Sequence, residues 1–124
     1  LCINIGGNKM KIKIFTSSES PEFAVRKANR FIRNLYEKGF EAMQVKISET
    51  NDFWDGYGQY TLKVWYEAKE KAILRKINFV DHYESQQDAF NELENISDSE
   101  YVDIDIFECN SFWAGKEVSG VVLF

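Results

Sequence analysis

The chain has 124 residues, of which 44% are hydrophobic and 15% aromatic, and its formal net charge is -5. This length and composition suffice for one domain with a packed core, and the negative charge argues against general nucleic-acid binding. Two cysteines without disulfide or metal spacing indicate a reduced setting, and there is no apolar run long enough to span a membrane or act as an export signal. We therefore predict a cytoplasmic protein with no cofactor, no metal site and no membrane partner.

Residues 1–9 fit neither of the two repeated units that follow, and they stop directly before Met10. Codons for a Gly-Gly pair shortly ahead of a methionine can spell a bacterial ribosome-binding site. We therefore expect Met10 to be the native start and residues 1–9 to be a non-native or disordered extension. The alternative is a short N-terminal strand, for which residues 2–5 have a suitable composition.

Residues 10–70 predict a β-α-β-β unit. The first strand alternates charged and apolar residues, which is the period of a half-buried strand with Ile12 and Ile14 facing inward. The helix begins after Ser20, an N-cap residue followed by a proline, and it ends at Gly39. Strands are expected at residues 11–15, 43–47 and 60–66, and the helix at residues 21–38.

Residues 71–124 repeat this order with a shorter and more acidic helix. The octapeptide at residues 49–56 reappears at residues 108–115 with Glu, Asn, Phe, Trp and Gly in register, which is an internal repeat. We predict an α+β fold in which two tandem βαββ repeats form one compact domain. Its six strands make one antiparallel sheet with both helices on one face and a pseudo-twofold axis. The second unit should have strands at residues 73–80, 101–107 and 118–124, and a helix at residues 85–96.

Each copy of the octapeptide places a Phe-Trp pair where a hairpin loop is expected. Loop tips are normally polar, and two large aromatic side chains left in water are costly, so something should cover them. Three coverings remain open: the end of the sheet itself, a second protomer, or a planar ligand stacked on the rings. The nearby Asn51 and Asn110 either close Asx-turns or bind a base edge. The aromatic residues concerned are Phe53, Trp54, Phe112 and Trp113.

Two further sets of residues are candidates for function. Arg26, Arg30 and Arg33 form a stripe on the first helix, which is either a solvated face or an anion site for a ligand phosphate or a neighbour's acidic helix. His82 is the single histidine and lies among acids, as a general base would, but no nucleophile or second base has an interpretable position. We therefore predict that the protein is not an enzyme.

The β-α-β-β order also carries a resemblance to a known family. With residues 16–20 (TSSES) leading from the first strand to the helix, and residues 64–67 (VWYE) ending the last strand, each unit resembles dodecin. Dodecins are small flavin-binding proteins that assemble into hollow dodecamers and hold flavins between stacked tryptophans. The resemblance implies ligand storage by stacking at a symmetric interface, without catalysis.

The function that we predict is sequestration of a small planar, nucleotide-type ligand by the aromatic residues, with the arginine stripe neutralising its phosphate. In its size, acidity and lack of a catalytic signature the chain resembles small phage-encoded counter-defence proteins, some of which act as sponges for nucleotide immune signals. A bare sheet face and two aromatic loops also predict a homo-oligomer.

The alternative is a protein-binding inhibitor or adaptor. Residues 71–124 hold eleven acidic against four basic residues, whereas residues 1–70 hold nine against eleven. The acidic second half would occupy a basic groove on its partner. The acids expected there include Asp98, Glu100, Asp103 and Asp105.

Overall fold

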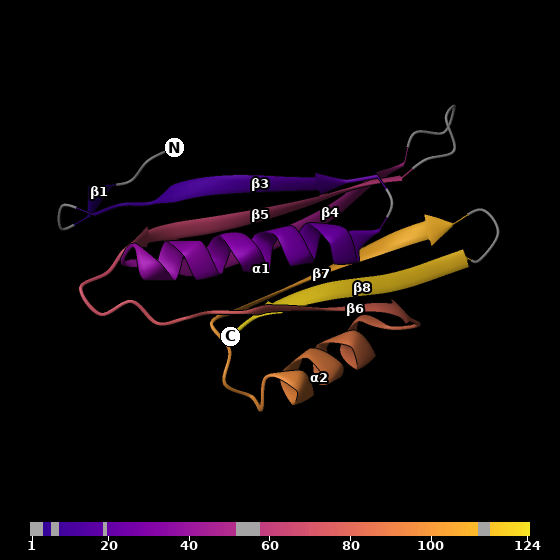
Figure 1. Ribbon diagram of the computed structural model, residues 1–124. Helices are drawn as coiled ribbons and strands as arrows, with labels where there is room; N and C mark the ends of the chain where they lie inside the picture. Colours follow the sequence, from indigo (N-terminus) through magenta and orange to yellow (C-terminus); the bar gives the residue numbers. More distant parts are fainter. Residues whose placement is uncertain (1–3, 6–7, 19, 52–57, 112–114) are drawn as a thin grey trace.

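The computed structural model describes residues 4–5, 8–18, 20–51, 58–111 and 115–124, with side chains in 10–18, 20–49, 59–108 and 117–124 (Figure 1). All structural statements below refer to these residues. The elements are β1 (Asn4–Ile5), β2 (Asn8–Lys9), β3 (Lys11–Ser17), α1 (Pro21–Glu37), β4 (Phe40–Asn51), β5 (Gly58–Ala68), β6 (Ile77–Tyr83), α2 (Gln86–Ile96), β7 (Asp103–Ser111) and β8 (Gly115–Leu123).

The six long strands form two antiparallel sheets, which we call the first sheet (β3-β5-β4) and the second sheet (β6-β8-β7). The prediction of one six-stranded sheet is therefore wrong, although the α+β class is confirmed. The reason lies where β4 meets β7. The backbone N–H groups of Val45 and Ile47 donate to the side-chain carboxylates of Asp103 and Asp105, at 2.9 and 2.8 Å. Carboxylates thus occupy the place where a backbone ladder would join the two sheets.

The two helices do not lie on one face of one sheet, so that part of the prediction is also wrong. Helix α1 packs on the first sheet and also contacts β6, whereas α2 packs on the second sheet (Figure 1). Successive residues of β8 show that these are opposite faces of the second sheet. Val121 belongs to the core that α1 shares with the first sheet, and Val122 belongs to the core beneath α2. A strand buried on both faces accounts for the continuous apolar run at the end of the chain.

The two helices begin where the sequence predicts. Ser20 precedes α1 in an extended conformation, with Pro21 at the first helical position. Ser85 caps α2, because its side chain accepts a hydrogen bond from the backbone N–H of Asp88. Helix α1 buries six residues and α2 buries two. Neither of these helices, the two found in the described parts of the chain, has the length and apolar character needed to cross a membrane.

Strand β3 faces the opposite way from our prediction. Ile12 and Ile14 are 45% and 50% exposed, whereas Phe15 is buried. Lys13, on the same face as Phe15, places its ammonium group 5.8 Å from the centre of the Phe31 ring. A lysine can occupy that position because its aliphatic stem packs on an aromatic ring while its charge reaches water. The outer face of the first sheet is consequently apolar in part, with Trp65 directly opposite Ile12.

Three side chains tie the two halves together. Asn29 on α1 accepts a hydrogen bond from the backbone N–H of Ile77 at 2.7 Å and donates one to its carbonyl at 2.9 Å. The amide thereby satisfies the outer edge of β6 as a neighbouring strand would. Arg75 and Glu41 form an ion pair at 3.3 Å, so an acid of the first half pairs with a base of the second. This pairing runs against the net charges of the halves.

Candidate functional site

The strands β4 and β7 lie side by side and run in the same direction. Val45 is bonded to Asp103, and Ile47, two residues further along β4, is bonded to Asp105, two residues further along β7. The β4–β5 and β7–β8 hairpins therefore lead to the same end of the molecule, which we call the hairpin end (Figure 1). The two chain segments with the Phe-Trp pairs follow β4 and β7 at this end.

Four of the nine predicted ligand-binding residues lie outside the described part of the chain. Phe53, Trp54, Phe112 and Trp113 are among the residues that the structure does not describe. Asn51 and Asn110 lie on β4 and β7, but only their backbones are described. The structure thus locates the strands that lead to these residues, and the choice between sheet, protomer and ligand as their covering stays open.

The three arginines lie on the exposed face of α1. The guanidinium of Arg26 is 5.6 Å from the centre of the ring of Phe23, a side chain that is 42% exposed. Helix α1 follows β3, which ends beside the start of β5, so the helix begins near the hairpin end and runs away from it. With a rise of about 1.5 Å per residue, Arg33 lies roughly 10 Å further from that end than Arg26.

A second group of polar side chains lies on β6 and β8. Val80 is opposite Gly120 and Tyr83 is opposite Val118, so two residues of β6, Asp81 and His82, face one residue of β8, Ser119. This is a β-bulge, a feature that redirects side chains and is frequent beside functional sites. His82 has a φ of 65°, in the left-handed region that few residues other than glycine adopt.

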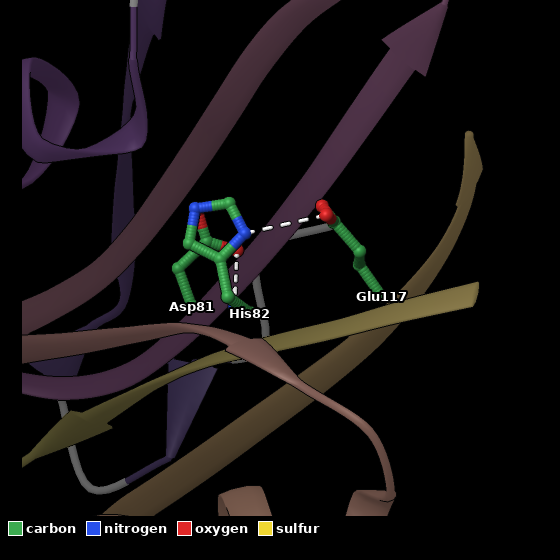
Figure 2. Close-up of side chains that lie close together, drawn as sticks. All are labelled: Asp81, His82 and Glu117. Carbon is green, nitrogen blue, oxygen red and sulfur yellow. Dashed lines mark hydrogen bonds and ion pairs between the residues drawn. The ribbon is translucent and has the colours of Figure 1, made fainter. Parts of the chain in front are cut away.

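The bulge brings His82 between two carboxylates, as Figure 2 shows. Its Nε2 atom lies 3.3 Å from Asp81 Oδ2, and its Nδ1 atom lies 3.3 Å from Glu117 Oε1. The other oxygen of Asp81 accepts hydrogen bonds from the backbone N–H of His82, at 2.8 Å, and from the hydroxyl of Ser119. The side chain of His82 is 73% exposed, while those of Asp81 and Glu117 are 28% and 32% exposed. We call Asp81, His82 and Glu117 the bulge cluster.

The chemistry of the bulge cluster follows from which atoms meet. Ser119 donates its hydroxyl to Asp81, and no contact joins it to the imidazole, so the described residues do not form the serine–histidine pair of a nucleophilic enzyme. One imidazole nitrogen and two carboxylates are instead metal-ligand types. Sequence reasoning found His82 and Asp81 but missed Glu117 and Ser119. The only signal for Glu117 and Ser119 in the sequence is that they are polar residues at the start of an otherwise apolar strand.

The second half also carries an open groove of about 590 Å³, with both polar and apolar lining, where the chain leads into β6 and β7. Four exposed side chains line it, Ile73, Leu74, Tyr101 and Val102, together with Asp98 and Glu100. These two acids are exposed, as the protein-binding alternative expects. The other two expected acids, Asp103 and Asp105, bind β4 instead.

The half-buried position of Asp105 shifts the pKa of its carboxyl group. Burial raises the pKa of its carboxyl group above the usual range, and the nearby Asp103 charge adds to the shift, while the N–H of Ile47 partly opposes it. The fold thus holds this carboxylate at the joint between the sheets although burial disfavours its charged form.

No protein-family model, curated protein or solved structure matches this chain.

Proposed function

We propose that this protein is a non-enzymatic binding protein that sequesters a planar, nucleotide-type ligand at its hairpin end. The observation that carries the proposal is the shared direction of β4 and β7. Because of it, the segments that contain Phe53-Trp54 and Phe112-Trp113 follow their strands at the same end of one molecule. Two aromatic pairs at one end can supply both sides of a stacking site, and stacking is tolerant of base identity.

A tandem duplication of one β-α-β-β unit is part of this proposal. It is supported by the order of elements, which is strand, helix, strand, strand in each half. It is also supported by the strand order, since in each sheet the third strand of the half lies between the first and the second. The resemblance to dodecin stays a prediction, and so does assembly into a homo-oligomer.

The non-enzymatic part of the proposal rests on the bulge cluster. A general base activates a nucleophile through a direct hydrogen bond or one water molecule. Among the described residues, the imidazole of His82 contacts two carboxylates and the nearby hydroxyl of Ser119 is engaged by Asp81. This arrangement favours holding a ligand or ion over activating a nucleophile.

The test is calorimetric titration of the protein with a panel of cyclic and linear nucleotides and flavins. Replacing Trp54 or Trp113 with alanine should weaken binding by about 1 to 3 kcal/mol, the scale of base–aromatic stacking. Trp65→Ala is the matched control, because Trp65 lies on the outer face of the first sheet, opposite Ile12, and should leave affinity unchanged. A parent protein that binds no member of the panel, or equal losses in all three variants, would contradict the proposal.

The groove in the second half favours a second candidate, binding of a partner protein. Four exposed large apolar side chains lie there beside two acids, which favours a partner segment that combines apolar and basic residues. Native mass spectrometry of protein purified from its host should then show a bound polypeptide that Leu74→Asp releases. Ile12→Asp is the control, since Ile12 is similarly exposed but belongs to the first sheet. A polypeptide retained by Leu74→Asp would exclude the groove as its site.

A further inference from the structure

We propose that the bulge cluster, Asp81, His82 and Glu117, binds a divalent transition-metal ion such as Zn²⁺. The inference is independent of the nucleotide-type ligand, because it uses neither the aromatic residues nor the arginines. The cluster offers one imidazole nitrogen and two carboxylate oxygens, all of which lie within 4.8 Å of one another. Three protein ligands with water in the remaining positions is a common form of zinc coordination.

The contact between His82 and Glu117 has the spacing of two ligands that share one ion. Zinc-bound nitrogen and oxygen atoms lie about 2.0 to 2.2 Å from the metal, so two ligands of a tetrahedral site are roughly 3.3 to 3.6 Å apart. The separation of Nδ1 from Glu117 Oε1 is 3.3 Å, which allows an ion to bind both without movement of the backbone. Asp81 Oδ2 faces the other edge of the ring, at 3.3 Å from Nε2. Because the two carboxylates meet different ring nitrogens, an ion shared by all three residues also requires the exposed His82 side chain to reorient.

Asp81 is already oriented for this role. Its Oδ1 atom accepts the backbone N–H of His82 and the hydroxyl of Ser119, which leaves Oδ2 for the ion. Hydrogen bonds of this kind to a ligating carboxylate set its direction and raise metal affinity. Ser119 itself is buried and fixed in the middle strand of the second sheet, so the orientation is built into the fold.

The donor set and charge select the class of ion. Two carboxylates supply two negative charges, which a divalent cation neutralises. Ca²⁺ and Mg²⁺ prefer sites made entirely of oxygen atoms, whereas an imidazole nitrogen favours zinc, copper, nickel or cobalt. The competing explanation is that the imidazole simply bridges the two acids, with no ion present.

His82 gives a direct readout, because the chain contains one histidine. We expect the imidazole resonances in an NMR titration to shift with Zn²⁺ and to saturate at one ion per chain, and Mg²⁺ at the same concentrations should leave them unchanged. The protein should carry Cys2→Ser and Cys109→Ser so that thiolates do not compete for zinc. Imidazole resonances that stay in place up to millimolar Zn²⁺ would overturn the proposal in favour of an imidazole that simply bridges the two acids.

Variants in the same background test each ligand by calorimetry with Zn²⁺ alone. Glu117→Gln and His82→Asn should each lower affinity at least about tenfold, and Ser119→Ala should lower it about 10- to 100-fold through the orientation of Asp81. Asp98→Asn is the matched control, since it removes an exposed carboxylate elsewhere and should have no effect. Parent-like zinc affinity in Glu117→Gln would show that the ion is held elsewhere and would overturn the assignment. No nucleotide is present in either experiment, so failure here leaves the proposed function standing.

Discussion

The two halves of the molecule have the same order of elements but differ in how their sheets are covered. The first sheet packs one face against α1 and leaves Ile12 and Ile14 exposed on the other. The second sheet lies between two cores, one shared with α1 and the first sheet and one beneath α2. Equal topology therefore does not imply equal burial. Whether a sheet face is buried depends on what the other half places against it.

The halves also differ in how much of the helix is buried. Helix α1 brings both small and large residues to the first core, among them Ala24, Ala28 and Ile32. In the second half a large residue on the helix, Leu93, approaches Gly120 on β8. Helix α2 buries only Ala89 and Leu93, so this close approach involves one of its two buried residues.

The largest expected effect concerns the joint between the halves. Replacing both Asp103 and Asp105 with alanine leaves the N–H groups of Val45 and Ile47 without these acceptors, at about 1 to 3 kcal/mol each. We therefore expect a loss of about 2 to 6 kcal/mol in the free energy of unfolding, measured by urea denaturation.

The asparagine variants at the same two positions keep an oxygen acceptor and should lose less. Glu100→Ala is the control for removal of an exposed acid, and it should stay within about 0.5 kcal/mol of the parent. If the double alanine variant were as stable as this control, the carboxylates would not be holding the sheets together.

The next effect tests the close approach of α2 to the second sheet. A Cβ at position 120 would lie 2.9 Å from both the Asp105 carbonyl oxygen and the Cδ1 atom of Leu93, so Gly120→Ala should destabilise by about 1 to 3 kcal/mol. A double-mutant cycle with Leu93→Ala should show positive coupling, because the smaller side chain removes one of the two clashes. Strictly additive losses would mean that α2 does not approach the sheet at this glycine.

A smaller effect is the pH dependence that Asp105 introduces. Its folded pKa is raised, so the folded state takes up its proton more readily than the unfolded state. Stability from this group is fully present below the ordinary carboxyl pKa of about 3.9 and is lost as pH rises through the folded value. Chemical denaturation at a series of pH values should show this loss in the parent and a flatter profile in Asp105→Asn. A steeper loss of stability with rising pH in Asp105→Asn than in the parent would contradict this prediction.

The smallest expected effect on stability is at the open face of the first sheet. Replacing Ile12 and Ile14 with lysine should change the free energy of unfolding by no more than about 0.5 kcal/mol each, because both side chains are about half exposed. If this face joins two protomers, as the predicted homo-oligomer would allow, sedimentation at micromolar concentration should show the parent associated and the variant monomeric. A monomeric parent would show that water covers this face.

The local elements could be predicted from the sequence because their signals are local. Proline and serine at the start of α1, and serine at the start of α2, specify where each helix begins. The face of β3 could not be predicted in the same way. Its strict alternation has two possible phases, and the choice depended on Phe31 of α1, over which Lys13 packs. The prediction of one six-stranded sheet was wrong for a similar reason. Nothing in the sequence pattern shows that aspartate carboxylates will take the place of a backbone hydrogen-bond ladder between β4 and β7.

The candidate site, too, was predicted from the sequence only in part. The repeated Phe-Trp segments and the arginine stripe are evident from spacing alone, but the common direction of β4 and β7 depends on hydrogen bonds between residues far apart in the chain. His82 is conspicuous as the single histidine, yet its partner on β8, Glu117, comes from the register of a bulge. The sequence by itself determined the elements, their order and their residue chemistry, because these follow from neighbouring residues. The tertiary structure alone decided which faces are buried, which acids serve the fold, and which side chains meet, because these depend on contacts that the chain forms only when its two halves pack together.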